Sequence, residues 1–169
     1  MNIVKPLARA AVTVALVAGL VSAGATSASA SVVFYQLQVR HSDMCGHVIP
    51  SGYVDQNTLI QAYCSGGSYD LFGLSPNGEG YYRLIVLATG KCLDVSGVSL
   101  SDRARVKQYT CHSGLNQQWE LRYTDSGYYE IVARHSQKCL DVQGDYVTYG
   151  AYIWQYTCDQ GYNQQFRFV

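Results

Sequence analysis

The sequence predicts an all-β domain with pseudo-threefold symmetry, and three observations carry this prediction. The stretch Lys91–Trp119 recurs 47 residues later without insertion or deletion, at Lys138–Phe166, and a more diverged copy occupies residues 45–72. The cysteines follow the same period, because each of three pairs is separated by 19 residues. Short alternating apolar and polar segments open each copy. Internal repetition of this kind indicates three copies of one unit, each of about 47 residues, at about 34–80, 81–127 and 128–169.

Each unit is expected to contain about four short strands. The first strands are Phe34–Val39, Tyr81–Val86 and Tyr128–Ala133, where apolar side chains at every second position form one buried face. A Cys-Leu-Asp-Val strand, a polar loop, a strand ending in Gln-Tyr-Thr-Cys and a glycine-bearing turn follow, before a last strand begins near Asn-Gln-Gln-Trp/Phe. No stretch after residue 30 combines helical periodicity with caps. Short strands with regular turn signals predict a barrel or sandwich, and three equal units favour a closed threefold form.

The first thirty residues have the pattern of a secretory signal peptide. Lys5 and Arg9 precede an apolar run at residues 10–20, and Ala28-Ser29-Ala30 is a small-residue cleavage signal. We therefore expect residues 1–30 to be removed, residues 31–169 to form one domain, and the protein to be secreted and extracellular. No other apolar stretch approaches the ~20 residues of a membrane-spanning helix, so no membrane span is expected.

Charge and composition narrow the class of partner. The sequence has 12 Lys and Arg against 12 Asp and Glu, so loss of the two basic leader residues leaves a small acidic excess. Nucleic-acid binding is not expected, because no basic run or stripe is present. Charged residues make up only 14% of the chain and Tyr occurs 15 times, which fits a compact β domain that meets neutral ligands.

The six cysteines are expected to form disulfides, because export places them in an oxidising compartment. Six cysteines allow fifteen pairings, and the threefold repeat favours the one in which each unit closes its own loop. A loop of about 20 residues contributes about 3 kcal/mol in the chain-entropy model. Neither a metal nor a cofactor is expected, because Cys-x-x-Cys pairs, ligand-spaced histidines and calcium-type acidic loops are absent from the sequence. The expected bridges are Cys45–Cys64, Cys92–Cys111 and Cys139–Cys158.

The Cys-Leu-Asp-Val, Gln-Tyr-Thr-Cys and Gln-x-Trp motifs resemble the ricin-B-type lectin repeat. That repeat also occurs in bacterial carbohydrate-binding modules attached to glycan-degrading enzymes. The resemblance covers Phe34 to Val169 and is strong in the second and third units but weak in the first. It implies a β-trefoil, in which three of six hairpins cap a short barrel and the Gln-x-Trp residues lie in the core.

The same resemblance implies sugar-binding residues. A pyranose has an apolar face that an aromatic ring covers, and a rim of hydroxyls that paired donors and acceptors recognise. In the family, an aspartate accepts hydrogen bonds from sugar hydroxyls, an aromatic residue two before the second Cys stacks, Asn binds a hydroxyl, and Gln mostly braces the aspartate. The corresponding residues are Asp94, Tyr109, Asn116 and Gln117 in the second unit, and Asp141, Tyr156, Asn163 and Gln164 in the third.

Two departures from the family pattern stand out. Family members often have Gln four residues before the second Cys, where this sequence has Lys107 and Trp154, and either change could alter sugar preference. The first unit lacks the site residues and is interpreted as structural. Its residues at the corresponding positions are His47, Ala62, Tyr69 and Asp70. The bland alternative for the aspartates is turn capping, and for the two tyrosines it is a position on a surface strand.

The expected function is carbohydrate binding without catalysis, for galactose-type sugars or xylan-like polysaccharides. The partner would be a glycan, including a cell-surface glycoconjugate, and a separate glycan-degrading enzyme is a further possible partner. The alternative is a protein-binding trefoil, such as a hydrolase inhibitor or toxin subunit, but equal loop lengths argue against the one long loop of an inhibitor. An enzyme has least support, since glycoside hydrolysis needs two carboxylates about 5 to 9.5 Å apart, and Asp94 and Asp141 belong to separate units. The choice of glycan, cooperation between sites and the oligomeric state stay open.

Overall fold

The computed structural model describes residues 32–51 and 55–169, so the predicted signal peptide lies outside the described residues. Twelve strands are described, four in each repeat, as predicted. The first repeat has β1 (Phe34–Val39), β2 (Cys45–Val48), β3 (Leu59–Ala62) and β4 (Leu71–Pro76); the second has β5 (Tyr82–Val86), β6 (Cys92–Val95), β7 (Ala104–Tyr109) and β8 (Trp119–Tyr123); the third has β9 (Tyr129–Ala133), β10 (Cys139–Val142), β11 (Ile153–Tyr156) and β12 (Gln165–Phe168).

Four one-turn 3₁₀ helices interrupt the strands in the second and third repeats. They are η1 (Ser96–Val98), η2 (Leu115–Gln117), η3 (Gln143–Asp145) and η4 (Tyr162–Gln164). These helices could not be predicted from the sequence, because a single turn is too short to show helical periodicity. Within the described residues, no helix is long and apolar enough to cross a membrane.

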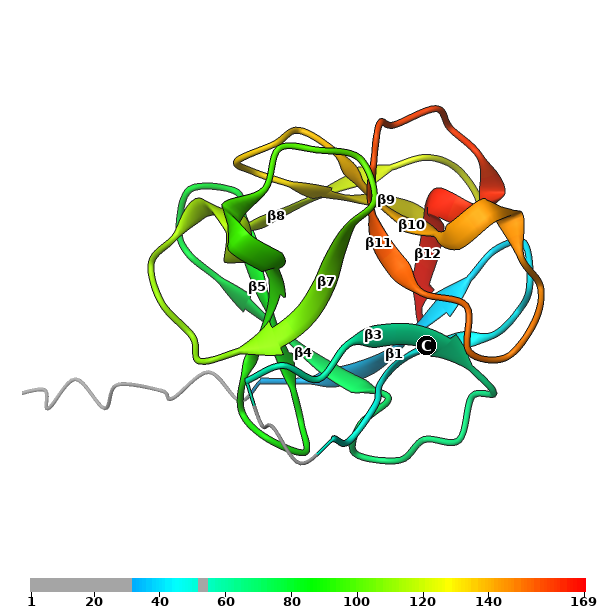
Figure 1. Ribbon diagram of the computed structural model, residues 1–169, viewed down its shortest axis with the longest axis horizontal. Helices are drawn as coiled ribbons and strands as arrows, with labels where there is room; N and C mark the ends of the chain where they lie inside the picture. Colours follow the sequence, from blue (N-terminus) through cyan, green and yellow to red (C-terminus); the bar gives the residue numbers. More distant parts are fainter. Residues whose placement is uncertain (1–31, 52–54) are drawn as a thin grey trace, which may run out of the picture. The chain divides into compact units, whose positions relative to one another are not determined.

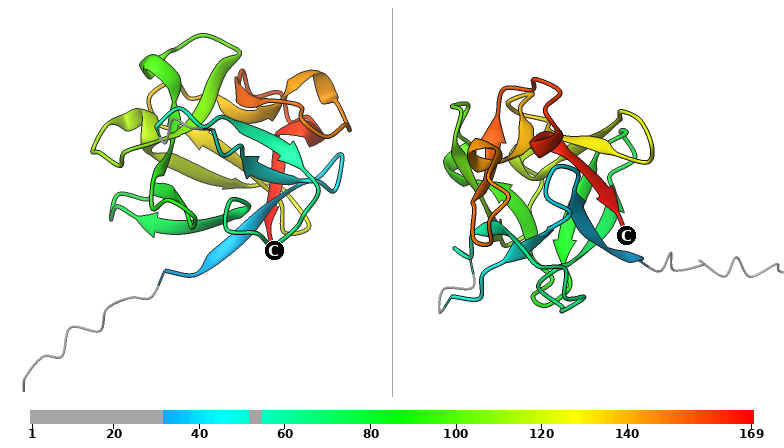
Figure 2. Two further views of the ribbon diagram at one scale, coloured as in Figure 1. Left: turned by 60° about the horizontal axis from the view of Figure 1, so that its bottom comes forward. Right: turned by 90° about the vertical axis from the view of Figure 1, so that its right-hand side faces the viewer.

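Antiparallel pairing closes six strands into a ring. β1 pairs with β4, β4 with β5, β5 with β8, β8 with β9, β9 with β12, and β12 again with β1. The remaining strands form three hairpins, β2–β3, β6–β7 and β10–β11. Figure 1 shows the repeats as three lobes around a centre, and Figure 2 shows β1 beside β12 near the C-terminus. This is the predicted β-trefoil with pseudo-threefold symmetry.

The core is built from equivalent residues of the three repeats. Phe72, Trp119 and Phe166, which are 47 residues apart, are fully buried, and the indole N–H of Trp119 donates to the carbonyl of Leu93 at 3.3 Å. Each buried aromatic or aliphatic side chain contributes about 1.5–3 kcal/mol relative to an exposed one. The Gln-x-Trp motif therefore supplies the centre of the barrel, as the family pattern implies.

The three predicted disulfides are confirmed. Each joins the first residue of a hairpin to the residue two positions beyond its second strand, with Cα atoms 5.0 to 5.2 Å apart. The bridges close each hairpin at its base and leave the polar loops at the far end free of covalent constraint. The described residues include no free cysteine.

A buried glutamine on the third strand of each repeat was missed by the sequence analysis. In the third repeat, the side-chain amide of Gln155 donates to the carbonyls of Ser99 and Ser101, both at 2.8 Å, and its oxygen accepts from the Ser136 hydroxyl at 2.7 Å. Ser99 and Ser101 belong to the polar β6–β7 loop of the second repeat. Gln155 therefore ties two repeats together through backbone groups.

The same contact recurs between the first and third repeats. Gln61 donates to the carbonyls of Tyr146 and Thr148, at 2.5 and 2.8 Å, in the β10–β11 loop. Gln108, the equivalent residue of the second repeat, is also fully buried and accepts from the Thr89 hydroxyl at 2.9 Å. Gln61 and Gln155 therefore each hold the polar hairpin loop of a neighbouring repeat in place.

Candidate functional site

The predicted residues of the second repeat meet at a hollow of about 300 Å³, here called the repeat-2 pocket. Asp94 lies on β6 and is only 4% exposed. The side-chain amides of Asn116 and Gln117, both on η2, donate to its Oδ2 at 2.8 and 2.9 Å. The pocket is lined by Gln56, Asp94, Gly97, Val98, Lys107, Tyr109, His112 and Asn116.

Gln117 lies behind Asp94 and is fully buried. Besides Asp94, its amide donates to the carbonyl of Thr110 at 3.1 Å, and its oxygen accepts from the backbone N–H of His112 at 2.9 Å. Its three contacts fix the carboxylate and the turn after β7 together. The structure thus places Gln117 as a brace, the role that the family resemblance assigns to it.

Gly114 is a further residue on which the site depends, and sequence reasoning did not single it out. A Cβ atom at this position would lie 2.7 Å from Oδ1 of Asn116, which is closer than a carbon and an oxygen can pack. Glycine therefore lets the turn run directly beside the asparagine that holds Asp94. Gly161 stands 47 residues later beside Asn163, so the repeat itself carried the signal.

The third repeat reproduces this arrangement in a larger hollow of about 390 Å³, the repeat-3 pocket. Asn163 and Gln164 donate to Oδ2 of Asp141 at 2.9 and 2.8 Å, and Gln164 is again fully buried. Gln164 also donates to the carbonyl of Thr157 at 3.0 Å. The lining residues are Arg103, Asp141, Gln143, Gly144, Asp145, Tyr146, Trp154, Tyr156, Asp159 and Asn163.

The two pockets differ at the position where the sequence departs from the family pattern. The indole N–H of Trp154 donates to Oδ1 of Asp141 at 2.6 Å. In the repeat-2 pocket, the equivalent Lys107 instead donates to Oε1 of Gln56 at 3.1 Å, and its ammonium lies 5.1 Å from the centre of the Tyr109 ring.

Burial raises the pKa of the Asp141 carboxyl above its ordinary value. The carboxylates of Asp159 and Asp145 raise the pKa further, while hydrogen bonds from Gln164 and Trp154 oppose the shift without reversing it. The repeat-3 pocket therefore concentrates negative charge around a buried acid.

Each pocket is completed by a residue of the preceding repeat. Gln56, in the turn between β2 and β3, borders the repeat-2 pocket, and Arg103, just before β7, borders the repeat-3 pocket. The guanidinium of Arg103 lies 5.9 Å from the centre of the Trp154 ring. Sequence reasoning missed both residues because it treated each unit separately, although Gln56 and Arg103 are 47 residues apart.

In the first repeat the carboxylate has changed position. His47 occupies the place of Asp94 and Asp70 the place of Gln117, and Nδ1 of His47 lies 2.5 Å from Oδ1 of Asp70. The Ser65 backbone N–H donates to Oδ2 of Asp70 at 3.0 Å, and the Ser65 hydroxyl also donates to this oxygen. Ala62, at the position of Tyr109 and Tyr156 in the other repeats, is buried. This repeat keeps a bonded polar pair without an aromatic platform at that position.

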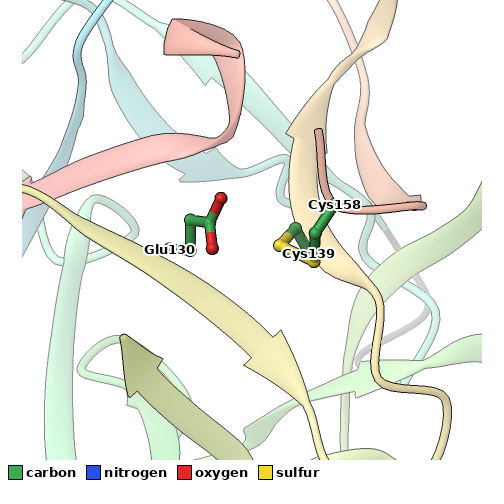
Figure 3. Close-up of side chains that lie close together, drawn as sticks. All are labelled: Glu130, Cys139 and Cys158. Carbon is green, nitrogen blue, oxygen red and sulfur yellow. A yellow bond between two sulfur atoms is a disulfide. The ribbon is translucent and has the colours of Figure 1, made fainter. Parts of the chain in front are cut away.

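A group of potential metal ligands in the third repeat is accounted for by a disulfide. Single donor atoms of Glu130, Cys139 and Cys158 lie within 4.8 Å of one another. Figure 3 shows the Glu130 carboxylate beside the two sulfur atoms, which are bonded to each other. Thiolates are the cysteine form that binds metals, so this bonded pair offers no such ligand.

Comparison with known proteins adds independent findings. The chain is similar to the designed threefold-symmetric protein ThreeFoil, with 43% identity, a TM-score of 0.78, and coverage of 80% of this chain and 97% of that one. It is similar to an exo-β-1,3-galactanase from Clostridium thermocellum, with 30% identity and a TM-score of 0.78 over 83% of this chain and 30% of the galactanase. Hemolytic lectin CEL-III matches at 27% identity and a TM-score of 0.67, over 80% of this chain and 30% of the lectin. None of the curated proteins compared with the chain matches it.

The galactanase and CEL-III are thus much longer than the part that this chain matches. The family model of the ricin-type β-trefoil lectin domain matches residues 33–166 of this chain. This range contains all twelve strands except the last two residues of β12, together with both pockets. The chain belongs to the ricin-type β-trefoil lectin domain family.

Proposed function

We propose that this protein binds galactose-type sugars through the repeat-2 and repeat-3 pockets. Carbohydrate binding in general is the function that the family supports. The observation that carries the finer proposal is a buried aspartate whose Oδ2 is held by an Asn and a Gln, beside a pocket that a tyrosine borders. This arrangement occurs twice, around Asp94 and around Asp141.

The side chains of each pocket have separate roles in this proposal. Asp94 and Asp141 accept hydrogen bonds from sugar hydroxyls, and Asn116 and Asn163 provide a polar edge beside them. Tyr109 and Tyr156 cover the apolar face of the ring; Gln117 and Gln164 act from behind, by holding the aspartates. Each pocket is shallow and association has a cost of several kcal/mol, so a single sugar is expected to bind weakly.

The sugar class is proposed from the solved relatives. The galactanase, which is 30% identical over the matched part, acts on a galactose polymer according to its name, and this supports galactosides as the first ligands to test. Xylan-like polysaccharides remain the second class. The domain itself is interpreted as a binding module, because its carboxylates are used to organise pockets in separate repeats.

We also propose that residues 1–30 are a signal peptide and that the protein acts outside the cell. Three disulfides in the described residues are consistent with an oxidising compartment. The proposed partners are polysaccharides or cell-surface glycoconjugates, with a separate glycan-degrading enzyme as a further candidate.

A glycan array probed with residues 31–169 tests the proposal. We expect the wild-type protein to bind galactosides, or xylans, and the Asp94→Ala/Asp141→Ala double variant to lose this binding. Two further single variants, Tyr109→Ala and Tyr156→Ala, each remove one of the proposed stacking rings, and each should weaken binding. Tyr63→Ala is the matched control, because Tyr63 is a tyrosine of the first repeat that is 70% exposed and lines neither pocket.

Two results would contradict the proposal. Absence of binding across a broad array would favour the protein-binding alternative, a hydrolase inhibitor or toxin subunit. Equal losses in the Tyr63, Tyr109 and Tyr156 variants would show that the pockets have no special role. Circular dichroism of each variant separates loss of binding from loss of fold.

A further inference from the structure

We propose that the two pockets differ in their preference for charged sugars: the repeat-2 pocket prefers a sugar acid with a carboxylate, and the repeat-3 pocket prefers the matching neutral sugar. Lys107 and Trp154 are the residues that decide this difference. The inference rests on the proposed function and deepens it by assigning a ligand class to each site.

Strand register places these two residues directly opposite the binding aspartates. Asp94 on β6 pairs with Lys107 on β7, and Asp141 on β10 pairs with Trp154 on β11. Side chains of directly opposed residues lie on the same face of a hairpin, close enough to interact. The residue at this position therefore faces whatever ligand the aspartate binds.

Trp154 reduces the hydrogen-bond accepting capacity that Asp141 can offer to a ligand. Oδ2 of Asp141 accepts from Asn163 and Gln164, and Oδ1 accepts from the Trp154 indole at 2.6 Å. Both oxygens of Asp141 are therefore engaged within the protein. In the part of the chain that the structure describes, Oδ1 of Asp94 receives no such donor, since Lys107 bonds to Gln56 instead.

The repeat-2 pocket also has an ammonium donor at its rim. Lys107 reaches the neutral amide oxygen of Gln56 at 3.1 Å and forms no ion pair with a carboxylate of the described residues. Nε2 of His112 lies 3.5 Å from Oδ2 of Asp94, and the His112 side chain is 41% exposed. Nearby Asp55 is already paired with Lys91 at 2.7 Å. The repeat-2 pocket thus combines Oδ1 of Asp94, which can accept from sugar hydroxyls, with the Lys107 ammonium, which has no carboxylate partner among the described residues.

The repeat-3 pocket has the opposite balance. Arg103 is its one basic lining residue, whereas three lining residues are carboxylic acids: Asp141, Asp145 and Asp159. An anionic sugar would be repelled by this excess of negative charge. Trp154 and Tyr156 instead offer two aromatic rings to the apolar face of a neutral sugar.

A hexuronate matches the repeat-2 pocket in both of its features. Its ring hydroxyls can donate to the open Oδ1 of Asp94, while its C6 carboxylate accepts a charge-assisted hydrogen bond from Lys107. The matching neutral hexose has a hydroxymethyl group in place of that carboxylate. Because Lys107 is only half-buried and stays in contact with solvent, the gain from the ion pair is modest, about fivefold in affinity.

Nuclear magnetic resonance titration of the whole domain tests the inference one pocket at a time. The side-chain amides of Asn116 and Asn163 report on the two pockets separately within one sample. The probes are two matched pairs of methyl glycosides, galacturonate with galactose and glucuronate with glucose. We expect Asn116 to report about fivefold tighter binding of a uronate than of its neutral partner, and Asn163 to report the reverse preference.

Variants locate the effect. Lys107→Gln should abolish the uronate preference at Asn116, so that a uronate and its neutral partner bind there with equal affinity. The control Arg122→Gln, which removes a basic residue that is paired with Glu120 and lines neither pocket, should keep the preference. Exchange of the two residues, Lys107→Trp with Trp154→Lys, should transfer the preference to the repeat-3 pocket.

Equal binding of both members of a pair at Asn116, or a preference that survives Lys107→Gln, would overturn the inference while leaving the proposed function intact. If none of the four glycosides shifts either amide, and the array also shows no bound glycan, the proposed function fails together with it. At the repeat-2 pocket, an increase to about 0.5 M salt should weaken the binding of the uronate but not that of the neutral sugar, since screening acts on the ion pair.

Discussion

At the scale of single residues, the three repeats carry a buried carboxylate in two different ways. In the second repeat Asp94 on the strand accepts from Gln117 on the turn. In the first repeat the acid is on the turn, as Asp70, and its partner His47 is on the strand. The acid and its partner stay in contact, but the acid has moved from the strand to the turn. The first repeat therefore keeps a bonded polar pair at this place and has no carboxylate on the strand that could face a ligand.

Asp70→Asn is expected to destabilise the fold by about 1–3 kcal/mol at pH 7, because Ser65 and His47 lose a charged acceptor. Burial raises the pKa of Asp70, but hydrogen bonds from Ser65 and His47 lower it by more, so the net pKa is below its ordinary value. The ionised form therefore contributes stability that is present above pH ~3.9 and lost as pH falls through the folded-state pKa. Urea unfolding followed by tryptophan fluorescence at pH 7 and pH 3 measures both effects.

The loss from Asp70→Asn should be smaller at pH 3 than at pH 7. Asp125→Asn is the control. Asp125 pairs with Arg40 but is itself exposed, so this substitution should change stability by less than about 1 kcal/mol. A loss of the same size at both pH values would show that the charge of Asp70 does not contribute.

Most residues proposed for the site could be predicted from the sequence because their contacts lie within one repeat. Asp94, Asn116 and Gln117 are brought together by one hairpin and the turn that follows, so the spacing of the motif is enough to place them. Gln56 and Arg103 could not be found this way, because they reach the pockets of a neighbouring repeat. Contacts between repeats depend on how the hairpins pack, which motif spacing does not encode.

At the scale of elements, the polar loops are held by side chains of other repeats. The β6–β7 loop carries no disulfide beyond its base, and Gln155 of β11 bonds two of its carbonyls. The hydrogen bonds of the glutamine replace the backbone pairing that an irregular loop lacks. η1 in the same loop includes Gly97 and Val98, which line the repeat-2 pocket.

Gln155→Leu is therefore expected to lower stability by about 2 kcal/mol, because the carbonyls of Ser99 and Ser101 lose their donor. Amide hydrogen exchange should also quicken in the β6–β7 loop before it does in the barrel strands. Ser136→Ala is the graded control: it removes only the donor to the Gln155 oxygen and should cost about 1 kcal/mol. If the two variants are equally stable, the loop does not depend on the glutamine.

The strands themselves were predictable to within about one residue where alternation is strong. Phe34–Val39 matches β1, while the expected Tyr81–Val86 and Tyr128–Ala133 each begin one residue before β5 and β9. Alternation reports which side chains face the core, and all three first strands line the same barrel. The three equal units favoured a closed form, but the trefoil architecture was implied only by the family resemblance, because pairing between distant strands does not affect local periodicity.

At the scale of the whole molecule, the closed barrel fixes the two pockets on one rigid body. The ring of six strands joins all three repeats, and their central aromatic residues share one core. The pockets therefore keep a constant separation. In the proposed function, a polymer bound at one pocket would hold its further sugars near the other pocket. Two weak sites on such a body raise affinity for a repeating ligand without any new contact.

We expect the intact domain to bind a galactan-coated surface about 10²-fold more tightly than it binds a single soluble galactoside, because the second contact is intramolecular. Tyr109→Ala or Tyr156→Ala should each remove most of this gain while the remaining pocket keeps its affinity for the soluble sugar. Surface plasmon resonance on immobilised galactan, with titration of the free sugar in parallel, measures both quantities. Tyr63→Ala should behave as the wild-type protein does, because Tyr63 borders neither pocket. If a single-pocket variant holds the galactan surface as tightly as the intact domain, the two sites do not engage one polymer together, and the rigid barrel serves each pocket alone.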